Sequence, residues 1–497
     1  MRELFDALHY RAGVAGDSLA FDDGIDRLDY AALARRVAGA AEELRAVSPS
    51  SAVIGVLGGN RVDWVVGQLA GWYAGRTVVP LPPFFRVSHL RHLARDAGVS
   101  YVWTTLDMVG TARLLGIPFA PIPDRLSSVV PAPSANAGQI IYTSGSTGEP
   151  KGVLLKSGQT MWTAQALARA IAARSDDSYL SVLPLALLLE TICAVMVPIL
   201  AGAAVRLETA FAANFGEGAT FPLAALVATH RPSCMALVPQ LLQTWIAQLN
   251  EARAMAPDSL RFVAVGGAAV CPALAQEAFR LGIPVYEGYG LSECGSVVAL
   301  NRPGARRPGT VGKPLPGLDI RIENGEIVVR GAPVMDGYLR STPARGICAT
   351  GDIGEIDDSG FLTVRGRRDN LIVTPMGRNI SPEWIESLIL SDPRIAHCVV
   401  THVEGPHLTA ILVPAPRDEV WFEQVSHDAI GAMVTACCRE APAYAVPRHY
   451  VVAPAAELAR FGLMTGNGRI RRKALLEAYA VMLAPRRSAP AAETVCK

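Results

Sequence analysis

The chain is long for a single compact domain and is nearly neutral. Its 497 residues include 46 Lys and Arg against 45 Asp and Glu, and half of them are apolar. The length predicts more than one domain with sizeable cores, and the balanced charge argues against nucleic-acid binding, which normally shows as a basic surplus. The nine cysteines show no Cys-x-x-Cys spacing, so neither a zinc site nor a disulfide framework is indicated. Unpaired thiols favour a cytoplasmic location.

The first hundred residues alternate between helix and strand patterns. Asp29 precedes a run with apolar residues at helical spacing, and Ala52–Gly58 is typical of a buried strand. Further helix and strand patterns follow in alternation over residues 64–73, 77–81, 89–97 and 101–104. This rhythm predicts a parallel sheet covered by helices. The first thirteen residues carry acids early and no apolar segment, so we expect no signal peptide.

Residues 182–205 are apolar enough to be considered as a membrane span. Glu190 lies near the centre of this run, and Pro184 and Pro198 interrupt it. A carboxylate in the middle of a lipid bilayer is costly. We therefore expect no membrane span but a buried strand, helix and strand over residues 179–185, 188–201 and 203–207.

The strand and helix alternation then continues, and the pattern changes after residue 319. Strands are expected over 234–239 and 261–267, each followed by a helix. Asn324-Gly325 is a strong hairpin signal, and a second hairpin turns at residues 358–360. The sequence predicts an α/β fold with a large N-terminal domain of mostly parallel sheets, a small β-rich subdomain, and a small C-terminal α+β domain.

The segment YTSGSTGEPKGV, residues 142–153, combines glycines with hydroxyl side chains and one lysine. Glycine permits backbone conformations in which several N–H groups point inward and form an anion site. The pattern therefore favours a polyphosphate ligand over an ordinary flexible surface loop. A Walker loop needs Gly-Lys-Ser/Thr at the start of a helix, whereas this segment has Pro150-Lys151-Gly152.

Three further segments follow in order: YEGYGLSE (286–293), TGDIGEIDDSGFLTVRGRRDNLIV (350–373) and GRNISPEWIE (377–386). Together with the glycine-rich segment they resemble the adenylate-forming superfamily of acyl-CoA synthetases, aryl-CoA ligases and carrier-protein adenylation domains. The resemblance covers nearly the whole chain. It implies a large ATP- and substrate-binding domain over 1–368, a mobile C-terminal domain over 369–484 with its hinge at Asp369, and a disordered tail over 485–497.

The resemblance also implies a role for individual residues in binding ATP and Mg²⁺. Tyr289 would stack on adenine, Asp352 would accept hydrogen bonds from the ribose hydroxyls, and Glu293 would reach Mg²⁺. The expected phosphate-binding positions are Thr143, Ser144, Gly145, Ser146, Thr147, Gly148 and Lys151. The expected adenosine-binding positions are Gly267, Ala268, Glu287, Gly288, Tyr289, Gly290, Leu291, Ser292, Asp352 and Arg367. The expected catalytic residues are Thr143, Glu293 and Arg469, and the expected substrate pocket comprises Leu187, Val238, Gly266 and Gly290.

The chain departs from the family pattern at two positions. Arg469 stands where the family carries a lysine that reaches the carboxylate and the α-phosphate, while Lys473, four residues on, fits a surface lysine better. Arginine is always charged, but its planar donors have a different geometry from an ammonium. Leu187 stands where many acyl-CoA synthetases have histidine or an aromatic residue, so the pocket is expected to be more apolar. Cys294 is expected to be a packing residue, because no histidine is placed to activate it.

These features predict a ligase that converts a carboxylic acid with an apolar acyl or aryl tail to an acyl-adenylate. A thiol, of coenzyme A or of a carrier protein, would then accept the acyl group; the alternative is a ligase that adenylates the acid but uses a different acceptor. Two other classes remain open. One is a non-catalytic nucleotide-binding relative, suggested by Arg469, and the other is a nucleoside-triphosphate hydrolase that uses the glycine-rich segment as a Walker variant.

Overall fold

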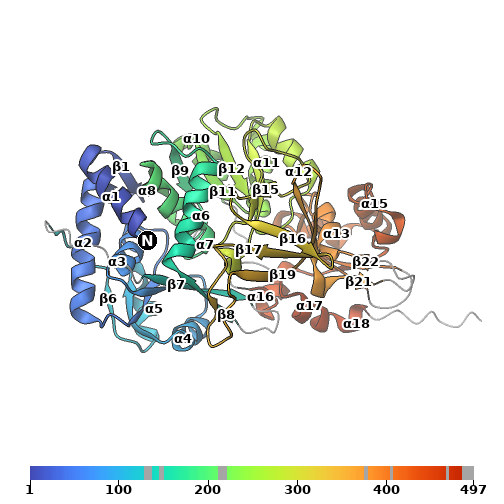
Figure 1. Ribbon diagram of the computed structural model, residues 1–497. Helices are drawn as coiled ribbons and strands as arrows, with labels where there is room; N and C mark the ends of the chain where they lie inside the picture. The colour runs from blue at the N-terminus through green and yellow to red at the C-terminus, as the bar shows by residue number, and fades with distance from the viewer. Residues whose placement is uncertain are drawn as a thin grey trace, which may run out of the picture. The chain divides into compact units, whose positions relative to one another are not determined.

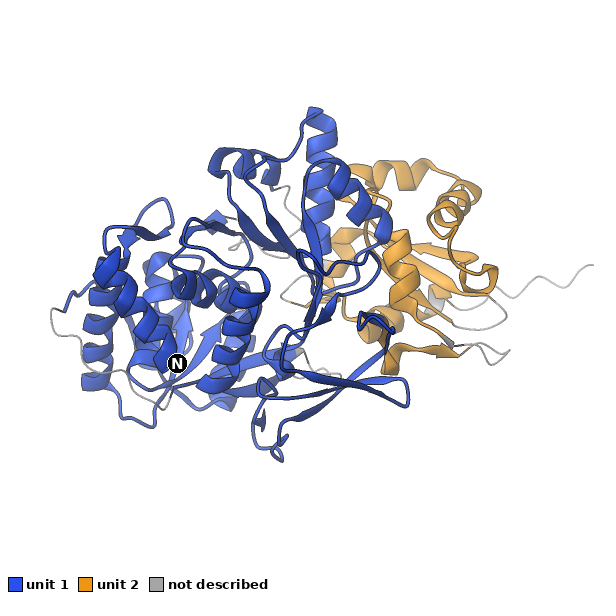
Figure 2. Cartoon of the chain, turned by 45° about the horizontal axis from the view of Figure 1, so that its top comes forward, with its two compact units in different colours: residues 1–364 blue, residues 365–497 orange. Residues whose placement is uncertain are grey.

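The computed structural model describes most of the chain and divides it into two compact units. The described residues are 1–127, 137–144, 150–210, 221–373, 379–402, 407–465 and 470–483. Unit 1 comprises residues 1–364 and unit 2 comprises residues 365–497 (Figure 2). The domain boundary expected after residue 368 and the hinge at Asp369 stay predictions.

Unit 1 contains a seven-stranded sheet whose core strands are parallel (Figure 1). In spatial order its strands are β18 (Gly337–Tyr338), β8 (Pro150–Lys156), β7 (Gly138–Ser144), β4 (Thr77–Leu81), β3 (Val53–Leu57), β5 (Val99–Thr104) and β6 (Phe119–Pro121). The helices of the same stretch are α2 (Tyr30–Val47), α3 (Val62–Tyr73), α4 (Val87–Asp96), η1 (Leu106–Met108) and α5 (Val109–Leu114). The predicted alternation is confirmed, and the Asp29 carboxylate caps α2 by accepting a 2.6 Å hydrogen bond from the Ala32 amide.

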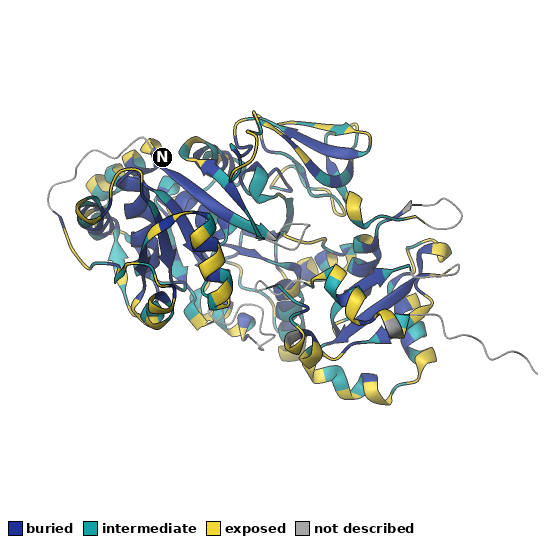
Figure 3. Cartoon of the chain, turned by 90° about the horizontal axis from the view of Figure 1, so that it is seen from below, coloured by how far each residue is buried: buried dark blue, intermediate teal, exposed yellow. Residues whose placement is uncertain are grey.

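Unit 1 also contains a nine-stranded sheet, parallel from β13 through β1. In spatial order its strands are β15 (Lys313–Pro314), β14 (Ala299–Leu300), β13 (Val285–Tyr289), β12 (Phe262–Val265), β11 (Cys234–Leu237), β9 (Ser178–Ser181), β10 (Ala204–Leu207), β1 (Leu19–Asp22) and β2 (Arg27–Asp29). The helices of these stretches are α1 (Arg2–Val14), α6 (Ser157–Ala170), α10 (Leu223–His230), α11 (Pro239–Ala252) and α12 (Pro272–Arg280). Helices α1, α6 and α10 are additional to the elements expected from sequence. The strands of this unit are mostly buried, and exposed positions gather on the outer helix faces (Figure 3).

The apolar run at residues 182–205 forms part of this interior. It contains α7 (Leu188–Glu190), a π-helical turn η2 (Thr191–Met196) and α8 (Val197–Ala201), which follow one another without a break between β9 and β10. The strand, helix and strand predicted here are confirmed, although β9 ends at Ser181, four residues before the expected end. Among the described residues, no helix is both long and apolar enough to cross a membrane.

A four-stranded antiparallel sheet completes the described part of unit 1 and reaches the start of unit 2. Its strands, in spatial order, are β16 (Asp319–Glu323), β17 (Glu326–Arg330), β19 (Ile347–Ile356) and β20 (Leu362–Arg367). Asn324 and Gly325 have φ values of 52° and 81°, so both residues adopt the left-handed conformation that a tight hairpin turn requires. The expected β-rich subdomain is therefore present.

Unit 2 is a small α+β unit. Its strands are β21 (Ile372–Val373), β22 (Asn379–Ile380), β23 (Ile395–Thr401), β24 (Thr409–Pro414) and β25 (His449–Val452). Its helices are η4 (Arg368–Asn370), α13 (Pro382–Ile389), η5 (Pro416–Asp418), α14 (Glu419–Gln424), α15 (His427–Cys437), η6 (Ala443–Ala445), α16 (Ala455–Arg460), α17 (Arg472–Ala478) and α18 (Ala480–Leu483). The buried Glu386 of α13 accepts a 2.7 Å hydrogen bond from the Val400 amide and pairs with Arg472, which joins α13, β23 and α17.

Candidate active site

Several predicted site residues lie at one edge of the nine-stranded sheet. Strands β9, β11, β12 and β13 run parallel, so their carboxyl ends meet at the same edge. Val238 follows β11, Gly266 to Ala268 follow β12, and Gly290 to Ser292 follow β13, while Leu187 lies six residues beyond β9. Ligands of such sheets bind at the carboxyl ends of the strands. This edge therefore brings together residues that are far apart in the sequence.

Tyr289 and Asp352 form the most direct link within the candidate nucleotide site. The Tyr289 hydroxyl at the end of β13 donates a 2.6 Å hydrogen bond to Oδ2 of Asp352 on β19. Asp352 is buried, with 7% of its surface exposed. Burial raises the pKa of the Tyr289 hydroxyl, and the negative charge of Asp352 raises it further. The tyrosine is thus held in its neutral, donating form, and the carboxylate keeps acceptor capacity for other hydroxyls.

Gly290 follows Tyr289 at a point where the backbone is closely packed. A β-carbon at this position would lie 1.6 Å from the Ser296 carbonyl oxygen. No side chain fits there, so the requirement for glycine is steric. The close approach also fixes the path of the chain between Tyr289 and the short helix η3 (Ser292–Cys294), which carries Glu293.

Glu293 is joined to the glycine-rich hairpin through Tyr338, a residue that the motifs did not indicate. The Tyr338 hydroxyl donates a 2.9 Å hydrogen bond to Oε1 of Glu293. Tyr338 pairs with Val153 of β8, and the Lys151 ammonium lies 5.6 Å from the centre of its ring. The predicted metal-binding carboxylate and the predicted phosphate-binding lysine therefore contact the same aromatic side chain.

The described parts of the glycine-rich segment lie in two consecutive, paired strands. Strands β7 and β8 are antiparallel, with Thr143 opposite Lys151 and Ser144 opposite Pro150. A Walker loop connects a strand to a helix, so this topology contradicts the Walker-variant alternative. The predicted phosphate-binding residues Gly145, Ser146, Thr147 and Gly148, and the side chain of Ser144, lie outside the described residues.

Glu287 and Cys294 are interior groups beside the site. Glu287 is buried, and its Oε2 accepts a 2.9 Å hydrogen bond from the Asn301 amide group. Burial raises its pKa to about 7, against the opposing effect of Arg306. Cys294 is fully buried, and a hydrogen bond with Cys348 together with burial raises the pKa of its thiol. A protonated buried thiol is a poor nucleophile, which agrees with the packing role expected for Cys294.

Three predicted functional residues belong to unit 2 rather than to this sheet edge. Arg367 ends β20, and Asp369 lies in the short helix η4. Arg469 lies outside the described residues. Their roles in the site stay predictions. Glu293 is the one residue that the sequence predicts to bind a metal. The described residues contain no group of three or more His, Cys, Asp or Glu side chains that could hold a metal.

The donor set around Glu293 fits Mg²⁺ in company with a polyphosphate. Mg²⁺ is usually held by one or two carboxylates together with substrate phosphates, and it keeps several waters. One carboxylate, joined through Tyr338 to strand β8 at the end of the expected phosphate-binding segment, matches that description. The fold and site thus define an adenylate-forming acid–thiol ligase.

Comparison with known proteins identifies the family. Residues 8–339 match the model of the AMP-binding enzyme family, and residues 369–484 match the AMP-binding enzyme C-terminal domain. Because the first match alone covers more than half of the chain, the chain belongs to the AMP-binding enzymes.

Named relatives and solved structures resemble this chain over most of its length. The long-chain-fatty-acid–CoA ligase FadD15 of Mycobacterium bovis is 28% identical over 84% of this chain and 85% of its own. The anthranilate–CoA ligase AuaEII in complex with anthranoyl-AMP has 18% identity and a TM-score of 0.83 over 97% of this chain and 98% of its own. The O-succinylbenzoate–CoA synthetase of Bacillus subtilis with ATP and magnesium ion has 24% identity and a TM-score of 0.77 over 94% of this chain and 98% of its own. These structures share the fold of this chain.

Proposed function

We propose that this protein uses ATP and Mg²⁺ to activate an apolar carboxylic acid and then transfers the acyl group to the thiol of coenzyme A. In the first step a carboxylate oxygen attacks the α-phosphorus of ATP, the bond to the β-phosphate breaks, and pyrophosphate leaves. In the second step the thiol sulfur attacks the acyl carbon, loses its proton and displaces AMP. Such reactions depend mostly on positioning and charge neutralisation.

The observation that carries this proposal is the arrangement of Tyr289, Asp352 and Glu293 beside the glycine-rich hairpin. Asp352 supplies an acceptor for the ribose hydroxyls, and Tyr289 offers its ring to adenine while its hydroxyl stays bonded to Asp352. Gly267 and Ala268 are exposed at the end of β12, where an adenine edge could rest without a large side chain in its way.

The hairpin and Glu293 would hold the polyphosphate. Thr143 and Lys151 face each other across β7 and β8, and the remaining expected phosphate-binding positions come between them in the sequence. Glu293 would bind Mg²⁺, which supplies positive charge to the phosphates. Tyr338 keeps the Glu293 carboxylate close to Lys151 through its hydroxyl and its ring.

The C-terminal residues complete the proposed cycle. Arg469 would neutralise the carboxylate and the α-phosphate during the first step, and Arg367 would bind the ribose or a phosphate. The C-terminal domain would turn about Asp369 between the two steps. Coenzyme A is preferred over a carrier protein as the acceptor, because the named relatives are coenzyme A ligases. A cytoplasmic location, where coenzyme A and ATP are available, remains a prediction.

The experiment is a screen of carboxylic acids for the release of AMP and pyrophosphate. Acid-dependent formation of both products is the expected result. Release of ADP and orthophosphate would contradict adenylation. Adding coenzyme A or a phosphopantetheinylated carrier protein in parallel reactions identifies the acceptor, because only the true acceptor becomes acylated.

The substitution of Arg469 for the family lysine motivates a second candidate, a relative that binds nucleotide without adenylating an acid. This candidate predicts ATP binding with no acid-dependent exchange of labelled pyrophosphate into ATP. Exchange with any acid of the screen excludes it.

A further inference from the structure

A pocket at the amino ends of three strands of the nine-stranded sheet has no role in the proposed chemistry. Strands β1, β9 and β10 are parallel neighbours, so their amino ends share one edge of the sheet. The pocket lies where the end of α1 meets the starts of β1 and β10 and the loop before β9 (Figure 1). The candidate active site lies at the carboxyl ends of the strands, which is the opposite edge of the same sheet. The pocket is called the Arg11 pocket, after the charged side chain that lines it.

The Arg11 pocket is large enough for a small organic molecule. Its volume is about 410 Å³, and ligand pockets usually measure roughly 300–1,000 Å³. Besides Arg11, the residues Ala15, Ser18, Tyr30 and Ser175 line it, so its surface is partly polar and partly apolar. Among the described residues that line it there is no Asp or Glu.

Arg11 brings a positive charge to the pocket and keeps most of its donors unused. Its Nη2 donates a 3.1 Å hydrogen bond to the carbonyl oxygen of Leu200, near the end of α8. Gly202 makes room for the guanidinium, because a β-carbon there would lie 2.8 Å from Nε of Arg11. The buried Nε has no hydrogen-bond partner, and Arg11 forms no ion pair within the described parts of the chain. An arginine has five N–H donors, so donors remain for a ligand.

Capping of α8 explains only part of this arrangement. A basic side chain at the end of a helix is stabilised by the last carbonyl groups, and the bond to Leu200 provides that. Capping does not require a pocket beside the guanidinium, and it does not neutralise the charge of Arg11. The acids that flank the two lining serines in sequence do not pair with Arg11 either: Asp176 pairs with Arg174 at 3.1 Å, and Asp17 is exposed.

The walls of the pocket are held by hydrogen bonds that do not involve Arg11. The buried Tyr30 hydroxyl donates to the carbonyl oxygen of Ala203 at 2.8 Å and lies 3.1 Å from that of Pro198. Burial raises the pKa of this hydroxyl, against the opposing effect of the Arg11 charge, so the hydroxyl stays neutral. The Tyr30 amide donates to the carbonyl oxygen of Ser18 at 3.1 Å. The pocket is therefore formed without a ligand.

Two serines add hydroxyl groups beside the guanidinium. Ser18 and Ser175 line the pocket and are exposed, and their hydroxyls make no hydrogen bond to the part of the protein that the structure describes. A serine hydroxyl can both donate and accept a hydrogen bond. The pocket thus offers one positive charge for an anionic group and two hydroxyls for polar groups attached to it.

We propose that the Arg11 pocket binds a small organic anion, with one carboxylate or phosphate group on a body that carries hydroxyl groups. The Arg11 guanidinium holds the anionic group, since hydrogen bonds between charged partners are the strong ones. Ser18 and Ser175 bind the hydroxyl groups of the body. The site is separate from the proposed ATP site and does not depend on the proposed function.

The first test titrates matched probes into the unmodified protein by calorimetry, with saturating AMP to occupy the proposed nucleotide site and with constant ionic strength. Glycerate and glycerol 3-phosphate share one hydroxylated body and carry a carboxylate and a phosphate, whereas glycerol carries no charge. At least one of the two anions should bind at a single saturable site, and glycerol should bind at least about tenfold more weakly. The tighter anion identifies the charged group. Equal affinity for glycerol, or no binding of either anion, would overturn the proposal.

The second test removes the charge of the pocket. Arg11→Gln should weaken binding of the anion about ten- to a hundredfold, as expected for the loss of a hydrogen bond between charged groups. Arg2→Gln, at an exposed position of the same helix, is the matched control and should bind the anion normally. ATP affinity should stay within about twofold in both variants, because the two sites lie at opposite edges of the sheet. Unchanged affinity for the anion in Arg11→Gln would show that it binds elsewhere and would overturn the proposal.

The third test fills the pocket and leaves Arg11 in place, which keeps the proposal testable should Arg11→Gln fail to fold. Ala15→Leu should weaken binding of the anion about tenfold or more, because the larger side chain occupies the space of the ligand. Ala252→Leu, the same change at an exposed position of α11, is the matched control and should have no effect. Normal binding of the anion to Ala15→Leu would contradict the proposed site.

Discussion

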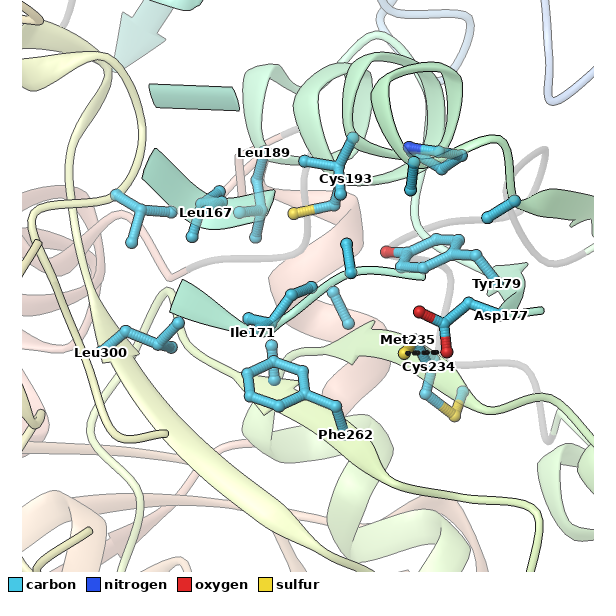
Figure 4. Close-up of a pocket in the computed structure, with 18 residues that line it drawn as sticks. Leu167, Ile171, Asp177, Tyr179, Leu189, Cys193, Cys234, Met235, Phe262 and Leu300 are labelled. Carbon is cyan, nitrogen blue, oxygen red and sulfur yellow. Dashed lines mark hydrogen bonds between the residues drawn. The ribbon is translucent and has the colours of Figure 1, made fainter. Parts of the chain in front are cut away.

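The edge of the nine-stranded sheet differs from an apolar cavity in the interior of unit 1 in the kind of side chain that it gathers. The cavity is lined by residues of β9, β11, β12, α6 and the helical segment 188–201 (Figure 4). At the edge, polar groups such as Tyr289, Asp352 and Glu293 are held by hydrogen bonds that reach from one sheet to another. Alanines and aromatic rings line the cavity, and the carboxylate of the lining residue Asp177 is paired with Arg261. The comparison shows that the sheet edge gathers polar groups held by hydrogen bonds, whereas the cavity presents a mostly apolar surface.

Arg469 provides the strongest test of the polar region. If it neutralises the carboxylate and the α-phosphate, Arg469→Ala should slow acyl-adenylate formation about a hundred- to a thousandfold, or about 3–4 kcal/mol. Chemically made acyl-adenylate should still pass its acyl group to the thiol at nearly the normal rate. Single-turnover measurements of both steps check this.

Two further variants serve as controls for the Arg469→Ala experiment. Arg469→Lys restores the family residue and should retain or increase adenylation. Lys473→Ala, at an exposed position of the same basic stretch, should have little effect. If Arg469→Ala leaves adenylation within about twofold of the unmodified protein, Arg469 is a surface residue.

Glu190 tests whether the interior near the cavity tolerates charge. Burial raises its pKa to about 8 in the folded protein, while an exposed glutamate titrates near 4.3. Between these values the folded state holds a proton that the unfolded state has lost, so stability should fall as pH rises from about 4.3 to 8. Glu190→Gln should remove this pH dependence, which amounts to about 4 kcal/mol between pH 4.3 and 8.

Denaturant unfolding at pH 5, 6.5 and 8 measures the effect of Glu190. Glu251→Gln, at an exposed position of α11, is the matched control and should keep the pH dependence of the unmodified protein. Parallel stability curves for the protein and for Glu190→Gln would show that Glu190 ionises normally and that the interior near the cavity accommodates a charge.

Asp352 is expected to contribute to ATP binding through its acceptor oxygens. Loss of a hydrogen bond to a charged acceptor costs about 1.5–3 kcal/mol, so Asp352→Ala should weaken ATP binding roughly ten- to a hundredfold. Calorimetric titration of the folded variant measures this. Asp358→Ala, on the exposed hairpin turn, is the control and should bind ATP normally. Unchanged affinity in Asp352→Ala would remove the residue from the nucleotide site.

Tyr338 should have the smallest effect of the four. Tyr338→Phe keeps the ring beside Lys151 but removes the hydroxyl that donates to Glu293. A typical hydrogen bond contributes about 0.5–1.5 kcal/mol, so the apparent KM for ATP should rise roughly two- to twelvefold at limiting Mg²⁺. Excess Mg²⁺ should reduce this difference. Tyr10→Phe, at an exposed position of α1, should change neither value.

Much of the fold was predictable because its signals are local. The alternation of apolar runs and amphipathic segments over residues 52–104 predicted the strands and helices found there, and Asn324-Gly325 predicted the turn between β16 and β17. Helices α1 and α6 were not predicted. The helix α6 begins at Ser157-Gly158, and glycine near its start weakens the local helical signal. Its position is instead stabilised by packing against the interior.

The sequence by itself determined the chemistry of this protein, since the order of its motifs indicated an adenylate-forming ligase and named Tyr289, Glu293 and Asp352. Only the tertiary structure decided how those residues are held. Tyr338 lies in no motif, yet it links Glu293 to Lys151, and the cavity is lined by alanines and leucines that resemble any core. The physical reason is that residue type fixes which groups can donate, accept or carry charge, whereas a contact or an empty volume depends on which distant strands the fold places side by side.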